Sequence, residues 1–261
     1  MRYKRRILVP VFFVLTFPLF AQTVLHTIVI DPGHGGKDVG AQSSDGKIYE
    51  KDLALTFALR LKKNIEKQLN KKVILTRDRD IFISLEDRVR KANKAHADLF
   101  LSIHLNAAQR NGAKGVEIFF LSADPSDSDA KKLALIENRH IYDFEDKKNN
   151  KESHDHALEF ILHDLAKNEY LSQSKYFAGL IEDELKKKMS AKDSRRLRQA
   201  PFYVLAGTFM PSILIELGFI TNGDDLKKLQ KNKVMDLYGN AIIDAIKSLD
   251  YYLVQKKVPA Q

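Results

Sequence analysis

The sequence predicts an α/β fold in which a mostly parallel, twisted sheet is flanked by helices. Short runs rich in Val, Ile and Phe alternate along the chain with longer segments whose apolar residues recur every three or four positions. The runs are almost continuously apolar, as in strands that helices cover on both faces. The length of 261 residues and the hydrophobic content of 44% suit one domain with a sizeable core.

The expected elements follow one another in a regular order. Strands are expected at 26–30, 72–77, 97–104, 115–121, 202–205 and 211–217. Helices are expected at 50–69, 84–96, 175–189 and 234–253. The second helix opens with Ser84 and has Asp87 three residues later, which is the pattern of a capping box.

Residues 1–21 have the pattern of a secretory signal peptide. "MRYKRR" is basic, the run up to residue 20 is apolar, and Ala21 supplies a small residue at a cleavage point. The alternative is an uncleaved membrane anchor, but a spanning helix needs about 20 apolar residues and this run holds two prolines. We therefore expect an exported protein with no stable membrane anchor after cleavage.

Charge and cysteine usage narrow the function classes. The net charge of +9 suits an anionic polymer as substrate, and nucleic acid is a poor partner for an exported chain. The chain has no cysteine, which excludes disulfides, a cysteine nucleophile and a cysteine-ligated metal. Histidine and carboxylate side chains are then the ligands left for a metal such as zinc.

Residues 122–172 interrupt the alternation of strands and helices. They contain no strand pattern and hold twelve acidic residues against seven basic ones. Helical segments expected at 129–144 and 156–170 flank a polar loop. We interpret the region as a helical, acidic insertion laid on the edge of the sheet, and the "HDH" within it is more typical of a surface than of a second metal site.

Four polar residues lie where an open α/β sheet collects its functional groups, near the carboxyl ends of strands. His34 follows the first strand, Glu50 begins the first helix, His104 ends the third strand, and Glu216 lies within or at the end of the last. Two imidazoles and one carboxylate are a common ligand set for catalytic zinc. His34, Glu50 and His104 would fill that set, and Glu216 would serve as the general base.

Each of these residues also has a plain structural explanation. A histidine after a strand is commonly a hydrogen-bonded loop residue, and a glutamate at a helix start complements the helix dipole. Glu216 is harder to explain, because it lies between Ile215 and Leu217, where an unpaired buried carboxylate is costly. The glycines around His34 would let the loop turn tightly and leave room for a metal and a substrate.

Five sequence blocks carry a resemblance to a known family. They are "IVIDPGHGGKDVGA", "YEKDLALTFALRL", "VILTRDRD", "LEDRVRKANKAHADLFLSIHLNA" and "PSILIELGFITN". In this order they resemble zinc-dependent N-acetylmuramoyl-L-alanine amidases of the amidase-3 type, over roughly residues 27–252. The resemblance implies a peptidoglycan hydrolase that cuts the amide between N-acetylmuramic acid and L-alanine of the stem peptide, in cell-wall remodelling and daughter-cell separation. It also implies a periplasmic or cell-wall associated location, which the predicted signal peptide fits.

The resemblance also assigns roles to residues. The zinc ligands of the family match His34, Glu50 and His104, with one Zn²⁺ per active site, and its catalytic glutamate matches Glu216. Residues 22–261 would form a single amidase catalytic domain, expected to be a monomer. Val39 stands where many relatives have proline, and Leu217 stands where threonine is commoner before the glycine.

Division amidases of this family often carry an inserted helical segment that covers the active site. An acidic side chain from it occupies the open position of the metal until a partner protein pulls the helix away. The resemblance thus implies autoinhibition by residues 122–172 and an activator protein that acts on them. The candidates are Glu137, Asp143, Glu145 and Asp146. Glu145 and Asp146, beside the hydrophobic "YDF", are preferred, and a surface insertion without regulatory consequence is the alternative.

Two other functions stay open at this point. One is a zinc amidohydrolase or peptidase that acts on a different bond of the cell wall, which only substrate profiling separates. The other is a degenerate amidase that binds peptidoglycan or a division protein without cutting. Such a binder would lack a metal ligand or the general base, and all four matching residues are present.

Overall fold

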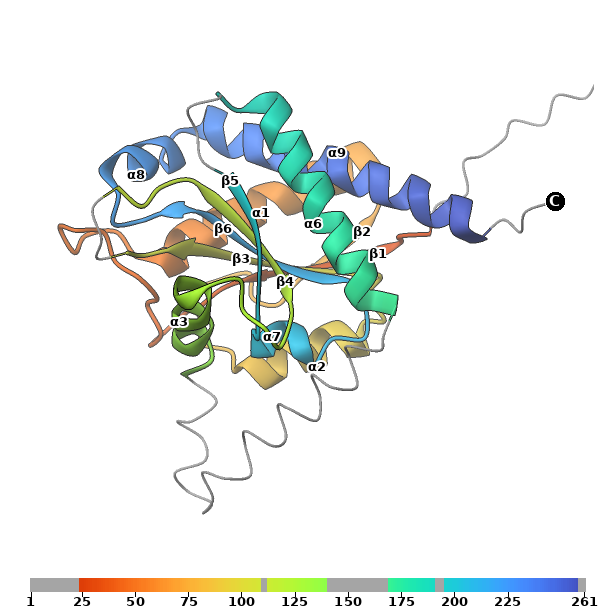
Figure 1. Ribbon diagram of the computed structural model, residues 1–261, viewed down its shortest axis with the longest axis horizontal. Helices are drawn as coiled ribbons and strands as arrows, with labels where there is room; N and C mark the ends of the chain where they lie inside the picture. Colours follow the sequence, from red (N-terminus) through yellow and green to blue (C-terminus); the bar gives the residue numbers. More distant parts are fainter. Residues whose placement is uncertain (1–23, 109–111, 140–168, 191–194, 258–261) are drawn as a thin grey trace, which may run out of the picture.

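The computed structural model describes residues 24–108, 112–139, 169–190 and 195–257. In these residues, six strands form one sheet in the order β2-β1-β3-β6-β4-β5 (Figure 1). The parallel part consists of β1 (Thr27–Pro32), β2 (Lys72–Leu75), β3 (Leu99–Asn106) and β6 (Ser212–Phe219). The reversed part consists of β4 (Val116–Leu121), antiparallel to β6, and β5 (Arg195–Ala200), parallel to β4. The predicted α/β fold with a mostly parallel sheet is confirmed.

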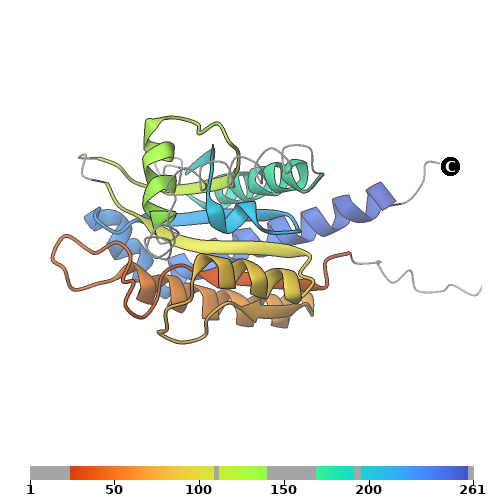
Figure 2. The ribbon, with the colours of Figure 1, turned by 90° about the horizontal axis from the view of Figure 1, so that it is seen from below.

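Helices cover both faces of the sheet. One core lies beneath α1 (Glu50–Leu69), α6 (Glu169–Lys188) and α9 (Asn232–Lys257). The other lies beneath α2 (Leu85–Lys94), α3 (Ser128–Glu137) and α7 (Tyr203–Ala206). The short helix α8 (Gly223–Leu229) follows β6. Figure 2 shows α3 crossing the direction of the strands.

The alternation of side chains along the strands decides which face carries the chemistry. On β3, Leu101 and Ile103 pack into the core beneath α1, whereas Phe100 packs into the core beneath α2, α3 and α7. Because successive side chains of a strand point to opposite faces, His104 lies on the same face as Phe100. His104, and Glu216 opposite it on β6, therefore lie on the face that α3 covers.

The helix expectations hold well near the site. α1 spans the predicted residues, and Ser84 caps α2 by accepting a hydrogen bond from the backbone N of Asp87 at 3.2 Å. In the described part of the insertion, α3 is helical as expected. None of the helices in the described ranges is long and apolar enough to cross a membrane. The predicted leader, residues 1–21, lies outside those ranges.

One predicted strand is wrong. Residues 202–205 form most of the short helix α7, and the strand at this edge of the sheet is β5, whose sequence is "RRLRQA". Pro201 ends the strand, because proline cannot donate a ladder hydrogen bond. β5 lacks an apolar run because it pairs only with β4, and its Arg198 is buried against a carboxylate of that strand.

Candidate active site

Glycines in and near the loop after β1 leave space in which the side chains of His34, Glu50 and His104 come together. His34 has a φ of 58°, in the left-handed region. A Cβ on Gly33 would lie 2.4 Å from Cε1 of His104, and a Cβ on Gly40 would lie 2.6 Å from Oε2 of Glu50. Larger residues at these two positions would fill the space in which the imidazoles and the carboxylate converge.

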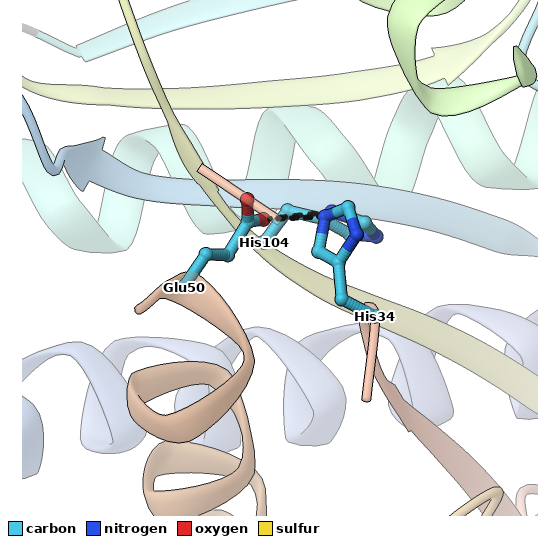
Figure 3. A group of neighbouring side chains, drawn as sticks. All are labelled: His34, Glu50 and His104. Atoms are coloured by element: carbon cyan, nitrogen blue, oxygen red, sulfur yellow. Dashed lines mark hydrogen bonds and ion pairs between the residues drawn. The ribbon is translucent and has the colours of Figure 1, made fainter. Parts of the chain in front are cut away.

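His34, Glu50 and His104 come together from three elements: the loop after β1, the first turn of α1 and β3 (Figure 3). All three are buried, and their ligand atoms lie within 4.8 Å of one another. Oε1 of Glu50 is 3.1 Å from Nε2 of His34 and 3.0 Å from Nδ1 of His104. The structure thus gathers the three residues that the sequence analysis assigned as metal ligands.

The donor set fits a zinc ion. Nδ1 of His34 lies 2.8 Å from the carboxylate of Asp38, which leaves Nε2 facing the cluster. Among the described residues, Nε2 of His34 is buried without a hydrogen-bond partner. Such an orphaned polar atom is unfavourable, and a divalent cation held by two imidazoles and a carboxylate would satisfy it.

Glu50 is held rigidly as an ionised group. Its Oε1 accepts a hydrogen bond from the backbone N of Leu105 at 2.9 Å, and its Oε2 accepts one from that of Ala41 at 2.8 Å. Burial opposes ionisation, but His34 and His104 beside it lower the pKa of Glu50 well below 4.5. The charge of the ligand set is therefore present at neutral pH.

The environment of His34 is correspondingly anionic. Burial alone would lower its pKa, but the carboxylates of Glu50 and Glu137 and the hydrogen bond to Asp38 raise it well above 6.5. Ligation of a metal requires a neutral imidazole, so binding of a cation here would release a proton. A cluster with this negative potential attracts either a proton or a metal.

Glu216 lies on β6 directly beside the histidines, since it pairs with His104 in the register of β3 and β6. It is 1% exposed, and its Oε2 has no hydrogen-bond partner among the described residues. Burial, and then the nearby carboxylates of Glu50, Glu137 and Glu117, raise its pKa well above 4.5. A carboxylate tuned in this way is suited to accept and return a proton near neutral pH.

Comparison with known proteins places this arrangement in a family. The family described as N-acetylmuramoyl-L-alanine amidase (Amidase_3) matches residues 28–248. The chain belongs to this amidase family. The amidase AmiA of Escherichia coli strain K12 is 35% identical over 234 residues, which cover 88% of this chain and 78% of AmiA. AmiC of E. coli O6:H1 is also 35% identical, over 85% of this chain, but the match spans only about half (52%) of AmiC.

Solved structures of amidases have the same fold. The N-acetylmuramoyl-L-alanine amidase of Clostridium difficile 630 superposes with a TM-score of 0.64 at 29% identity, over 90% of this chain and 99% of the other. The CwlD amidase from Clostridioides difficile, solved in complex with the GerS lipoprotein, gives 0.63 at 25% identity, over 86% and 98%. The fold class and the enzyme class that the five sequence blocks indicated are confirmed.

In this amidase a further carboxylate reaches the histidines. Oε2 of Glu137, the last residue of α3, lies 3.4 Å from Nε2 of His34 and 3.2 Å from Nδ1 of His104. Glu137 is one of the four acidic candidates from the insertion. The preferred ones, Glu145 and Asp146, lie outside the described residues, as does Asp143.

Two buried arginines that the sequence analysis missed fix the loop of this amidase. Arg77 donates to the carbonyl of Gly33, and Arg88 donates to that of His34, each at 2.7 Å. Arg88 also pairs with Asp31 at 2.7 Å. An arginine in an amphipathic pattern is usually assigned to the solvent face, so nothing in the sequence singled these two out. They orient His34 by holding its backbone.

Proposed function

We propose that the protein is a zinc-dependent hydrolase of peptidoglycan that cleaves the amide between the lactyl group of N-acetylmuramic acid and L-alanine of the stem peptide. The observation that carries the proposal is the convergence of two imidazoles and a carboxylate beside a buried, unpaired carboxylate, in a chain of this amidase family. The buried donors are Nε2 of His34, Nδ1 of His104 and Oε1 of Glu50.

The chain's own residues suggest how the reaction proceeds. His34, Glu50 and His104 would hold the zinc ion, which when bound polarises the scissile carbonyl and lowers the pKa of water towards ~7. Glu216 takes the proton of the attacking water as its oxygen bonds to the carbonyl carbon. Glu216 then returns that proton to the nitrogen of L-alanine as the C–N bond breaks, which leaves a lactyl carboxyl group and a free amine.

We further propose that α3 restrains the enzyme. The carboxylate of Glu137 lies between the two histidine nitrogens, in the space that a metal and its water would need. Removal of α3 by an activator protein would then open the site. That CwlD of C. difficile forms a complex with a lipoprotein supports a protein partner for this chain. Cell-wall remodelling and daughter-cell separation are the proposed setting, after export through residues 1–21.

A digestion experiment tests the cleavage. The mature protein, loaded with zinc, is incubated with purified peptidoglycan, and the soluble products are analysed by mass spectrometry. We expect stem peptides with a free L-alanine amine and an intact glycan. Glu216→Gln should keep its zinc, measured by elemental analysis, and lose at least ~100-fold in turnover.

Other outcomes point to the alternatives. Products cut at another bond of the wall would favour a different zinc amidohydrolase or peptidase. A folded, metal-bound protein that cuts nothing, even with Glu137→Gln, would favour a peptidoglycan binder without catalysis. Retained turnover in Glu216→Gln would remove Glu216 from its role as the base.

A further inference from the structure

A row of polar side chains crosses the sheet beneath α3 and extends well beyond the proposed metal site. In the strand register, His104 pairs with Glu216, and Glu216 pairs with Glu117 of β4. Arg198 of β5 continues the row by donating to both carboxylate oxygens of Glu117, at 2.8 and 2.9 Å. Glu117 and Arg198 lie beyond the reacting groups, so amide hydrolysis itself does not account for them.

A cavity of about 830 Å³ opens at the end of this row that Glu117 and Arg198 form. It lies between α3 and the sheet, and the residues that line it include Asn106, Glu117, Lys132, Ile136, Arg198 and Thr221. This volume is within the range of pockets that hold small ligands. The cavity therefore gives a ligand of this size access to Glu117 and Arg198.

The two acidic partners of Arg198 differ in kind. The side chain of Glu117 is 5% exposed and also accepts a hydrogen bond from Asn106 at 2.9 Å, so it is a fixed part of the sheet. Asp127 contacts the other arm of the guanidinium, but its side chain is 51% exposed. Asp127 also caps α3 by accepting hydrogen bonds from two backbone amides of its first turn. Because Asp127 caps α3, displacement of α3 would also move Asp127 away from Arg198.

We propose that Arg198 binds a free carboxylate of the stem peptide, and that Asp127 occupies the same guanidinium when α3 covers the site. This inference rests on the proposed function. Stem peptides carry free carboxylates beyond L-alanine, and the Nη2 arm of Arg198, which Asp127 contacts, can donate a charge-assisted hydrogen bond to such a carboxylate. Arg198 then selects substrates with an acidic stem.

The placement of α3 agrees with this role. Its 10 residues span about 15 Å, close to the ~14 Å across the three strand spacings from β5 to β3. α3 thus presents Asp127 to Arg198 at one end and Glu137 to the histidines at the other. An extended peptide of about four residues covers the same distance. In the proposed arrangement, the carboxylates at the two ends of α3 therefore occupy positions that an acidic stem peptide would occupy.

Two soluble muropeptides that differ only in a stem carboxylate or the matching carboxamide test the proposal. With the zinc-loaded full chain, we expect kcat/KM to favour the carboxylate by about 10-fold or more, the usual value of a charged hydrogen bond. Arg198→Lys keeps a charge beside Glu117 but loses the Nη2 arm. It should abolish the preference by raising KM for the carboxylate substrate, with kcat/KM for the carboxamide changed less than about 3-fold.

Asp127→Asn is a second variant, which tests the proposal even if Arg198→Lys does not fold. Asparagine caps a helix as well as aspartate does, so this variant keeps α3 while it removes the competing charge. We expect kcat/KM for the carboxylate substrate to rise by about 5-fold or more, with no comparable rise for the carboxamide.

The outcomes separate the two proposals. Equal cleavage of both muropeptides by the wild type, or an equal loss on both in Arg198→Lys, would overturn the role of Arg198 and leave the amidase proposal intact. Lower activity in Asp127→Asn would do the same. If neither the wild type nor Glu137→Gln cleaves either muropeptide between the lactyl group and L-alanine, the amidase proposal falls, and the role of Arg198 falls with it.

Discussion

Oε2 of Glu137 lies 3.2 Å from Nδ1 of His104, although the two residues come from a surface helix and a buried strand. Only a carboxylate aimed into the site makes this contact. The end of α3 therefore contacts the centre of the proposed metal site directly.

Replacing Glu137 should therefore release the enzyme. In Glu137→Gln the side chain keeps its size but loses the charge that competes for the histidine nitrogens. We expect basal turnover of peptidoglycan to rise by about 5- to 150-fold, the usual range of a coupling between sites. Glu86→Gln, on the exposed surface of α2, is the matched control and should leave the rate unchanged. Unchanged turnover in Glu137→Gln would argue against autoinhibition by this residue.

Asp38 should control the affinity for zinc. Its carboxylate accepts the Nδ1–H of His34 at 2.8 Å and so presents Nε2 to the metal. We expect Asp38→Asn to weaken zinc binding by about 10- to 100-fold in a competition titration with a chelator. Asp45→Asn, in the same stretch of chain but bonded to Ser43, is the control. Equal affinity in the wild type and Asp38→Asn would show that the loop backbone alone orients His34.

Two glycines with the same φ allow backbone strain to be separated from steric collision. Gly40 and Gly46 both have a φ of +69°, but a Cβ on Gly40 would lie 2.6 Å from Oε2 of Glu50, whereas one on Gly46 would meet nothing within 4 Å. Gly46→Ala should cost only about 1 kcal/mol of backbone strain. Gly40→Ala should cost more and also reduce zinc binding. Thermal unfolding with and without zinc measures both effects, and equal behaviour of the two variants would contradict the collision.

Asp31 should make stability depend on pH in the acid range. Burial alone would raise its pKa, but Arg88 and the hydrogen bond from Thr76 lower it below 3.8. Because the folded pKa is the lower one, its contribution is present above pH ~3.9 and is lost as pH falls through the folded value. Asp31→Asn should cost about 3–5 kcal/mol at pH 7, since Arg88 stays buried without its partner.

Urea unfolding at pH 7 and at pH 3 tests this assignment. The free-energy difference between wild type and Asp31→Asn should shrink at pH 3, because the Asp31 carboxyl of the unfolded chain is largely protonated there whereas the folded chain has the lower pKa. If the free-energy difference is the same at both pH values, Asp31 stabilises the fold through its packing and hydrogen bonds and not through its charge.

The sequence is informative where chemistry and position coincide. His34 follows a clear element, Glu50 begins one and His104 ends one. Glu216 is conspicuous because a charged residue interrupts an apolar strand. Their convergence could be proposed from the rule that functional groups gather at strand ends. The leader and the remaining insertion candidates, Asp143, Glu145 and Asp146, stay predictions.

The sequence is uninformative where burial is achieved by pairing. Arg198 and Glu117 cancel each other's charge across two strands, so β5 has the composition of a surface segment although Arg198 is 6% exposed. Arg77 and Arg88 are likewise buried by backbone carbonyls that are distant in the chain. Glu137 was one candidate among four because the predicted helix ran on to residue 144, whereas α3 ends at Glu137.

The direction of the strands has a consequence for how such an enzyme can diversify. The loop after β1, together with β3 and β6 of the parallel half of the sheet, carries His34, His104 and Glu216, whereas α3 belongs to the excursion between β4 and β5 in the reversed half. That excursion can lengthen, shorten or change sequence without displacing a reacting atom. The strength of the restraint and the rate of cutting can therefore evolve separately, so related enzymes can share one chemistry and answer to different signals.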